Sequence, residues 1–250
     1  MRVKNKTNLY KNIFLDLGGV LFYDEYVLLE FYYQSYLLIT QNRDVTSEDF
    51  FKARQSLYPQ YKSDWLRVYL KTLFNVNKME EIIAESWDNV LKNFSKLFVP
   101  YHNSIDFILE LKKKYKLYIV ANQPKEAQDV LNNTEITKYF EKIYLDTDIG
   151  LSKPDLKFYE YILNDSGVEA HETIHIGDRL DNDVIPALKL KICPIKLILP
   201  IKKISIEKID KKFATSFYKS ISDAWHRIEE NDVYDYSIFR SYDEIIETLN

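Results

Sequence analysis

The stretch IFLDLGGVLFYDE, residues 13–25, places a carboxylate at the end of an apolar run and follows it with a pair of glycines. Residues 11–16 are predicted to form a short buried strand that ends at Asp16. A carboxylate in that position is costly unless another group pairs with it or uses it. Gly18 and Gly19 allow the backbone to turn tightly beside it. The stretch therefore predicts a functional strand end whose partners come from later in the chain.

The composition is that of an ordinary globular protein. The 250 residues are 46% hydrophobic and 29% charged, and the formal net charge of −4 gives no sign of a general attraction to nucleic acid. The single cysteine, Cys193, allows no internal disulfide and favours a reduced, cytoplasmic setting. No run of about 18 apolar residues is present. The short N-terminal apolar run also lacks a small-residue cleavage site, so we expect neither a membrane span nor a signal peptide.

Two periodicities divide the chain. Residues 24–99 repeat apolar side chains every three to four positions, which predicts a helical block of three to five helices. From residue 100 onward the pattern alternates between helices and strands. The strands are expected at 116–122, 142–148, 172–178, 192–199 and 236–239, and the helices at 103–115, 124–133, 155–167, from 182 onward and at 242–250.

This alternation predicts an α/β core built on a Rossmann-like, three-layer parallel sheet with helices on both faces. The first strand belongs to that sheet, so the core is assigned residues 1–23 and 100–250, and the helical block 24–99 is an insertion. Residues 199–235 are charged and irregular, and their organisation is left open.

Polar side chains gather at the ends of the predicted strands. Because ligands of an open parallel sheet bind beyond the carboxyl ends of its strands, we expect these side chains to meet at one edge. The set consists of Asp16, Ala121, Asn122, Lys153, Asp178 and Asp183.

The chemistry of this set favours a metal site. Asp16, Asp178 and Asp183 offer the hard oxygen ligands that Mg²⁺ prefers. Lys153 can balance the charge of the carboxylates and of a phosphate. Together they predict a metal-assisted phosphoryl-transfer centre, in which a carboxylate can act as a nucleophile.

Four segments in order, DLGGV (16–20), VANQ (120–123), SKPD (152–155) and GDRLDND (177–183), resemble the motifs of the haloacid dehalogenase (HAD) superfamily. The helical insertion after the first motif looks like the C1-type cap of that superfamily. The resemblance covers nearly the whole chain, least clearly residues 199–235. It implies a Mg²⁺-dependent hydrolase that removes phosphate from a small phosphorylated metabolite, with no nucleic-acid or membrane partner.

The resemblance also implies individual roles. Asp16 matches the nucleophile and a Mg²⁺ ligand, and Gly18 stands where the family offers a backbone carbonyl to the metal. Lys153 matches the lysine that holds nucleophile and phosphate together. Asp178 matches a direct metal ligand, and Asp183 an acid that binds the metal directly or through water. We further predict that Gly19, Ala121 and Asn122 contact the substrate.

Two positions depart from the family pattern. Gly18 replaces the usual second aspartate, which protonates the leaving group and typically contributes about 10²–10⁴-fold. Asp24 and Glu25, in the loop that enters the insertion, are the open candidates to substitute for it. Some relatives with a similar DLG motif are nonetheless phosphatases, notably of sugar phosphates with a better leaving group. Ala121 replaces the usual Ser or Thr, and a backbone N–H and Asn122 remain there.

Several alternatives stay open. Gly18 and Ala121 favour a catalytically degenerate HAD-fold binding or regulatory protein, whereas a metal-independent dehalogenase using Asp16 leaves Asp178 and Asp183 unexplained. Arg179 is expected to contact substrate or to pair with a neighbouring acid, and Asp181 to be solvated or to cap a helix. His175 lies in an apolar strand and is expected to be a core histidine. Neither the substrate nor the oligomeric state follows from the sequence.

Overall fold

The structure is a computed structural model that describes residues 9–203, 206–225 and 234–250. These residues divide into two compact units. The core unit contains the described residues of 1–24, 98–200 and 231–250. The helical unit contains residues 25–97 and the described residues of 201–230.

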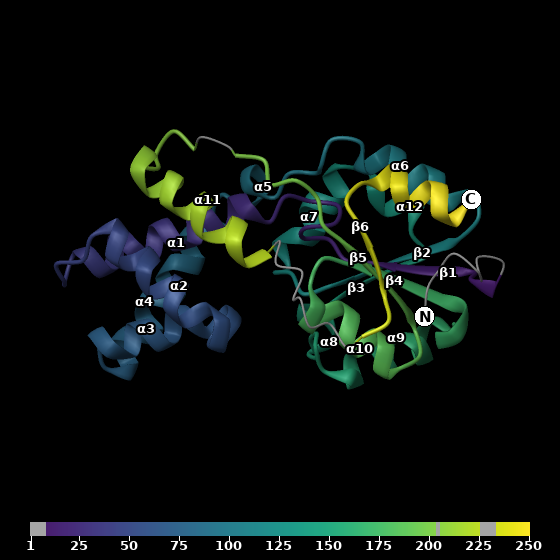
Figure 1. Cartoon of the computed structure of the whole chain (residues 1–250), viewed down its shortest axis with the longest axis horizontal. Helices are drawn as coiled ribbons and strands as arrows, with labels where there is room; N and C mark the ends of the chain where they lie inside the picture. The colour runs from purple at the N-terminus through teal and green to yellow at the C-terminus, as the bar shows by residue number, and fades with distance from the viewer. Residues whose placement is uncertain (1–8, 204–205, 226–233) are drawn as a thin grey trace. The chain divides into compact units, whose positions relative to one another are not determined.

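The core unit is built on one parallel sheet with the strand order β3-β2-β1-β4-β5-β6 (Figure 1). Its strands are β1 (Asn12–Leu15), β2 (Lys116–Ala121), β3 (Lys142–Leu145), β4 (Thr173–Gly177), β5 (Cys193–Leu197) and β6 (Ser237–Phe239). Strand β1 is central, and its residues Ile13, Phe14 and Leu15 are fully buried, as a strand covered on both faces requires. The predicted Rossmann-like parallel sheet is therefore confirmed.

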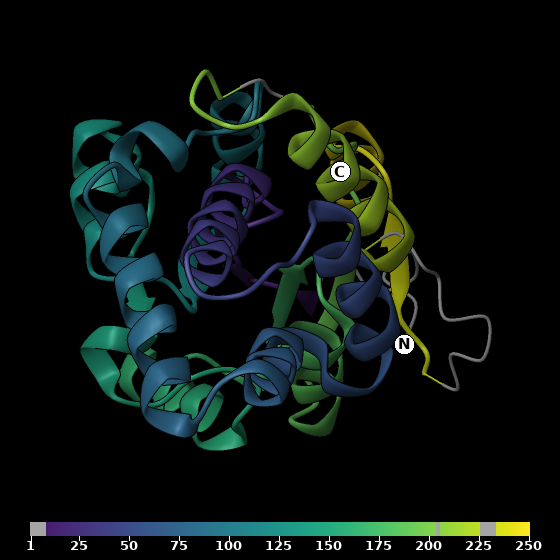
Figure 2. The same ribbon diagram turned by 90° about the vertical axis from the view of Figure 1, so that its left-hand side faces the viewer.

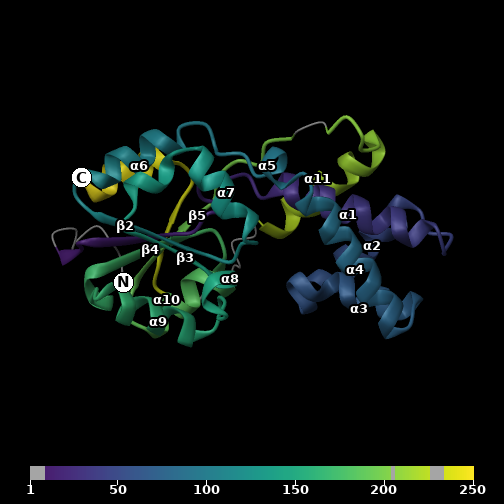
Figure 3. The same cartoon turned by 180° about the vertical axis from the view of Figure 1, so that it is seen from behind.

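Helices cover both faces of this sheet. Figures 1 and 3 show α6 and α12 on one face and α9 and α10 on the other. The α-helices of the core unit are α6 (Ser104–Lys112), α7 (Glu126–Asn133), α8 (Asp146–Ile149), α9 (Leu156–Ser166), α10 (Ile185–Lys189) and α12 (Tyr242–Leu249). The shorter helical turns are 310 helices at Ile136–Tyr139 and Ala170–Glu172 and a π-helix at Leu180–Val184.

The core beneath α9 and α10 is aromatic. Phe14 of β1 and Tyr118 of β2 meet edge to face, with ring centroids 5.7 Å apart. Phe158, Tyr159 and Ile162 of α9 pack into the same cluster and are fully buried. On the opposite face Phe107 of α6 stacks on Tyr242 of α12 at 4.2 Å.

The strand order reverses between β1 and β4, because β2 and β3 continue to one side of β1 while β4, β5 and β6 continue to the other. Open α/β sheets bind their ligands at such a reversal, beyond the carboxyl ends of the two strands. Asp16 follows β1 directly and Asp178 follows β4 directly. The topology therefore brings these two residues to the same place.

One predicted strand is shorter than expected. The sequence predicts a strand over 142–148, but β3 ends at Leu145 and residues 146–149 form the short helix α8. The physical reason is visible at Asp146, whose Oδ1 accepts a hydrogen bond from the backbone N–H of Gln123 at 2.8 Å. The Asp146 carboxylate thereby fixes the loop after β2, and the backbone turns into α8 at this residue.

The helical unit contains the insertion that the sequence predicted. Residues 25–97 form five α-helices and a 310 turn at Lys62–Asp64. The helices are α1 (Glu25–Thr40), α2 (Ser47–Tyr61), α3 (Trp65–Leu73), α4 (Val76–Leu91) and α5 (Phe94–Leu97). Helix α2 begins with a capping box between Thr46 and Asp49, which satisfies backbone N–H groups that a helix start leaves without partners.

The helical unit also contains a segment that the predicted boundaries gave to the core. Helix α11 (Lys211–Trp225) lies alongside α2 (Figure 2). Its Phe213 ring lies 4.9 Å from that of Phe51, and Arg54 donates a hydrogen bond from Nη1 to the carbonyl of Ser220 at 2.7 Å. The described residues of 201–230 therefore differ from the prediction for 100–250, because α11 buries its apolar face among the helices of 25–97.

No helix among the described residues is both long and apolar enough to cross a bilayer.

Candidate active site

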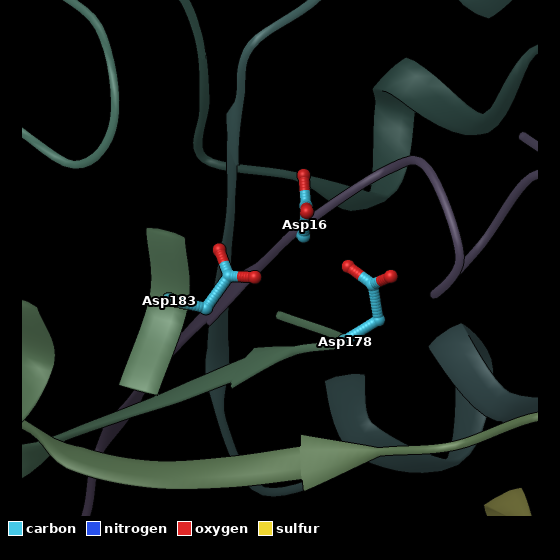
Figure 4. Close-up of side chains that lie close together, drawn as sticks. All are labelled: Asp16, Asp178 and Asp183. Carbon is cyan, nitrogen blue, oxygen red and sulfur yellow. The ribbon is translucent and has the colours of Figure 1, made fainter. Parts of the chain in front are cut away.

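Three carboxylates meet beyond the carboxyl ends of β1 and β4. Figure 4 shows Asp16, Asp178 and Asp183 turned toward a common point, and one oxygen from each lies within 4.8 Å of the others. Asp16 and Asp183 are buried, and Asp178 is half-buried. The sequence predicted this convergence from strand ends alone.

Lys153 lies between two of these carboxylates. Its Nζ is 2.9 Å from Oδ1 of Asp16 and 2.7 Å from Oδ1 of Asp183. The residue is only 4% exposed, so both ion pairs are shielded from solvent. Because burying a charge is costly unless it is paired, the lysine and the two acids depend on one another.

The backbone of Lys153 is held by Asn122, which follows β2. The Asn122 side chain donates from Nδ2 to the Lys153 carbonyl at 2.8 Å and accepts from the Lys153 N–H at 2.9 Å. Asp155 then caps α9 by accepting from the Lys157 N–H at 2.9 Å. Asn122 thus positions the lysine, and its predicted contact with substrate stays a prediction.

Asp183 is fixed by partners on both oxygens. Besides Lys153, its Oδ1 lies 3.2 Å from Nε2 of His175, and its Oδ2 accepts from the Arg179 N–H at 3.0 Å. His175 is fully buried and also lies 3.3 Å from the hydroxyl of Tyr159. His175 is therefore part of the core, as expected, and it also contacts the acidic cluster.

Asp178 has a different environment from Asp183. Within the described part of the chain, none of the hydrogen bonds or ion pairs involves the Asp178 carboxylate. Burial and the nearby charges of Asp183 and Asp16 raise the pKa of Asp178 well above its ordinary value. The charge of Arg179 acts in the opposite direction but does not outweigh them.

The remaining pKa shifts follow from the same crowding. Burial raises the pKa of Asp16, and the attraction of Lys153 offsets this only in part. Burial has the same tendency at Asp183, but Lys153 and the hydrogen bond with His175 outweigh it and lower the pKa. Burial works against the charge of Lys153, yet the two carboxylates raise its pKa. Lys153 therefore favours the charged form of Asp183 over its neutral form, whereas at Asp16 and Asp178 burial and the neighbouring carboxylates favour the neutral form.

Two glycines permit the close approach of these acids. A Cβ added to Gly19, whose φ is 70°, would lie 2.6 Å from Oδ2 of Asp178. A Cβ added to Gly177 would lie 2.3 Å from Cγ of Asp183. Any side chain at either position must displace a carboxylate of the cluster.

The space beside Gly18, where the family has a second aspartate, is occupied by the carboxylate of Asp24. A Cβ added to Gly18 would lie 2.5 Å from Oδ1, 2.6 Å from Cγ and 2.8 Å from Oδ2 of Asp24. Burial and the charge of Asp16 raise the pKa of Asp24 to about 6, although a hydrogen bond with the Gln123 side chain and the charges of Arg179 and Lys153 act in the opposite direction. The structure thus places a carboxylate beside Gly18 from six residues further along the chain.

Other predicted residues take simpler places. Ala121 is the last residue of β2 and is fully buried. Arg179 pairs with Asp181, with Nε 3.1 Å from Oδ1 and Nη2 2.8 Å from Oδ2. Of the two expectations for Arg179, the structure supports pairing with a neighbouring acid.

Sequence reasoning did not foresee the clamp between Asn122 and Lys153 or the contact between His175 and Asp183. The sequence signal for the close approach of backbone and carboxylates was the placement of its few glycines, because Gly177 comes directly before Asp178. The pairing of side chains across different loops has no such signal, because it depends on how each loop folds.

Comparison with known proteins decides the family. The family model described as haloacid dehalogenase-like hydrolase matches residues 35–196, which is more than half of the chain. The chain belongs to the haloacid dehalogenase-like hydrolase family. The HAD match includes Asn122, Lys153, Asp178 and Asp183, and it begins after Asp16.

Curated relatives of this HAD chain include phosphatases. It is 32% identical over 104 residues to glyceraldehyde 3-phosphate phosphatase of Methanocaldococcus jannaschii, covering 41% of this chain and 46% of that protein. It is 27% identical over 85 residues to D-ribitol-5-phosphate phosphatase of Bacteroides thetaiotaomicron, covering 31% and 41% of the two chains. The matched regions therefore span about half or less of these relatives.

Solved structures share the HAD fold over nearly the whole chain. A HAD phosphatase from Thermococcus onnurineus matches with a TM-score of 0.62 and 20% identity, covering 96% of this chain and 98% of that one. The HAD-hydrolase YfnB from Bacillus subtilis, solved with magnesium bound, matches with a TM-score of 0.62 and 17% identity, covering 96% and 99%. These likenesses confirm the fold.

Proposed function

We propose that this protein is a Mg²⁺-dependent phosphatase that removes phosphate from a small phosphorylated metabolite, with Asp16 as the nucleophile. One observation carries the proposal: three carboxylates converge, Lys153 pairs with only two of them, and Asp178 has no hydrogen-bond or ion-pair partner among the described residues. Such a cluster is favourable when a divalent cation joins it, and it has no evident purpose otherwise.

The residues present fit Mg²⁺. The cluster offers carboxylate oxygens and no nitrogen or sulfur ligand, which is the donor set of a hard cation. Three negative charges face one positive charge, so two positive charges are needed to balance them. Asp16 and Asp178 would hold the ion with the backbone carbonyl of Gly18, and Asp183 would bind directly or through water. When bound, Mg²⁺ supplies a Lewis acid that offsets the charge of the phosphate.

The protein's own groups then carry the chemistry. A carboxylate oxygen of Asp16 bonds to phosphorus as the bond from phosphorus to the leaving oxygen breaks, which forms an aspartyl-phosphate. Asp16 is held in orientation because its Oδ1 accepts from the Leu17 N–H at 2.8 Å and from Lys153. Lys153 balances charge on the phosphate, and we propose that the backbone at Ala121 and Asn122 donates to its oxygens. The Gly19 N–H donates to the Phe22 carbonyl at 2.9 Å, so we propose that Gly19 contacts the phosphate by close approach alone. Water then hydrolyses the aspartyl-phosphate and regenerates Asp16.

The names of related proteins support a small substrate. Two relatives are named for phosphatase activity on glyceraldehyde 3-phosphate and on D-ribitol 5-phosphate. Both are short-chain phosphorylated metabolites. We therefore propose a phosphorylated sugar, polyol or triose as the substrate class. The helical unit follows the first motif where the family resemblance implies a C1 cap, and we propose that it selects the substrate.

Metal binding is tested by thermal unfolding of wild type and Asp178→Asn with and without Mg²⁺. A ligand at 100 times its Kd stabilises a protein by about 2.7 kcal/mol. For a chain of this size this raises Tm by about 5–10 °C. We expect this rise for wild type and little rise for Asp178→Asn. Without metal, the variant is expected to melt higher than wild type, because it removes a half-buried carboxylate that the charges of Asp183 and Asp16 repel.

Asp106→Asn is the matched control, since Asp106 is an exposed aspartate of α6. It should keep the full response to Mg²⁺. An equal response in wild type and Asp178→Asn would contradict the assigned metal site.

A second prediction concerns the backbone beneath the cluster. Gly177→Ala should displace Asp183 and reduce the rise in Tm that Mg²⁺ causes. We also expect the rate of phosphate release to fall by at least about tenfold, because misplacing a catalytic group by about 1 Å can cost 10²-fold. Gly167→Ala is the control: Gly167 has a φ of 67°, where alanine is strained, whereas Gly177 lies outside the left-handed region, but the Cβ added at Gly167 meets nothing within 4 Å. If both variants retain normal turnover, the close approach of Gly177 to Asp183 has no bearing on the reaction.

A further inference from the structure

The carboxylate of Asp24 occupies the space that a side chain at position 18 would need. All three of its terminal atoms, Oδ1, Cγ and Oδ2, lie within 2.8 Å of the Cβ that Gly18 lacks. The overlap therefore involves the whole carboxylate and not only its edge. A residue with a side chain at 18 and an aspartate at 24 in this conformation exclude each other.

Asp24 is anchored in this position by the chain just before it. The Tyr23 N–H donates to the Val99 carbonyl at 2.9 Å, and the Tyr23 ring lies 3.9 Å from that of Tyr101. The preceding residue, Phe22, stacks on Phe98 at 4.4 Å. All of these residues are in the core unit, as Asp24 is, so its position is set by the same body that carries Asp16.

Asp24 also belongs to the charged environment of the cluster. It interacts with the charges of Asp16, Lys153 and Arg179, and its own charge acts on Asp178. Asp24 is half-buried, so it is not sealed off from a ligand beyond the carboxyl ends of β1 and β4. Two neighbouring acids already form ion pairs, Asp183 with Lys153 and Asp181 with Arg179.

We propose that Asp24 is the acid–base residue of this site and does the work of the aspartate that is absent at position 18. This inference rests on the proposed phosphatase function. In the first step the Asp24 carboxyl gives its proton to the leaving oxygen as the bond from that oxygen to phosphorus breaks and Asp16 bonds to phosphorus. In the second step the Asp24 carboxylate takes a proton from water as the water oxygen bonds to phosphorus and the bond to Asp16 breaks.

This assignment separates the two candidates that the sequence left open. Glu25 is the first residue of α1 and belongs to the helical unit, whereas Asp24 belongs to the core unit and touches the empty position at Gly18. The departure from the family pattern at Gly18 is then a relocation of the carboxylate and not a loss of it.

The first test compares leaving groups. Asp24→Asn keeps the shape of the side chain but cannot donate the proton. We expect kcat/KM for glycerol 3-phosphate to fall by about 10²–10³-fold, because its alkoxide must be protonated as it leaves. For p-nitrophenyl phosphate, whose leaving group is stable as an anion, the fall should be less than about tenfold. Asp106→Asn should match wild type on both esters.

The second test moves the carboxylate. The variant Gly18→Asp with Asp24→Gly restores an acid at position 18 and removes the group that it would strike. The φ of Gly18 lies outside the left-handed region, so an aspartate fits the backbone there. We expect this double variant to hydrolyse glycerol 3-phosphate at least about tenfold faster than Asp24→Gly alone, with Tm confirming that both are folded.

The outcomes separate the inference from the function beneath it. Equal losses on the two esters in Asp24→Asn, or a folded double variant no faster than Asp24→Gly, would overturn the role of Asp24 and leave the phosphatase intact. A wild-type protein that hydrolyses neither ester with Mg²⁺ would overturn the proposed function and this inference with it.

Discussion

Asp16→Asn is expected to stop phosphate release almost completely, by at least about 10⁴-fold for any phosphate ester that wild type accepts. Loss of a nucleophile removes the covalent step itself, and such losses reach about 10⁶-fold in enzymes where they have been measured. Asparagine is close to aspartate in size and can still accept the hydrogen bond from the Leu17 N–H, so the fold should survive. Release of inorganic phosphate from a panel of esters, measured with and without Mg²⁺, provides the readout.

The same panel separates the competing functions. Substantial turnover by Asp16→Asn would exclude an aspartyl-phosphate mechanism. A folded wild type that is inert toward every ester would favour the binding or regulatory alternative, and turnover of a haloacid without metal would favour the dehalogenase. Acid quenching of wild type during turnover should trap phosphate on the protein, and Asp16→Asn should trap none.

Lys153→Met is expected to lower the free energy of unfolding by about 3–5 kcal/mol, because removing one member of a buried ion pair leaves the others uncompensated. Here two carboxylates lose their partner at once, since Nζ of Lys153 lies between Asp16 and Asp183. For a chain of this length the corresponding fall in Tm is roughly 6–20 °C. Methionine fills a similar volume, so the effect comes from charge and not from a cavity.

Lys157→Met is the control for this prediction. Lys157 lies only four residues further along the chain and is exposed, so its loss should change Tm by no more than about 1–2 °C. Thermal unfolding is measured at neutral pH with a chelator present, so that no metal contributes to the difference. If Lys153→Met melts with wild type, the buried ion pairs do not stabilise the fold.

The sequence predicted the parts of this protein that depend on local patterns. The buried run that ends at Asp16 and the alternation after residue 100 were sufficient for the parallel sheet. The convergence of Asp16, Asp178 and Asp183 followed, because neighbouring parallel strands end at the same edge. These inferences need only periodicity and topology.

Other features depend on distances that the sequence does not encode directly. Helix α11 was not foreseen, although Phe213, Phe217 and Ile221 are spaced four residues apart, because the longer segment 199–235 is charged and irregular. The contact of Asp24 with the empty position at Gly18 depends on the path of a loop. The clamp between Asn122 and Lys153 joins two loops that are 31 residues apart.

Helix α11 also has a consequence for how the chain is made. The helical unit draws on two stretches of sequence, so residues 25–97 emerge from the ribosome long before the helix that covers them. Until α11 is synthesised, the aromatic face of α2 around Phe50 and Phe51 has no Phe213 to pack against. A nascent chain therefore leaves this apolar surface of α2 without its α11 contacts until late in translation. Excising residues 25–97 as a module would likewise separate α2 from α11.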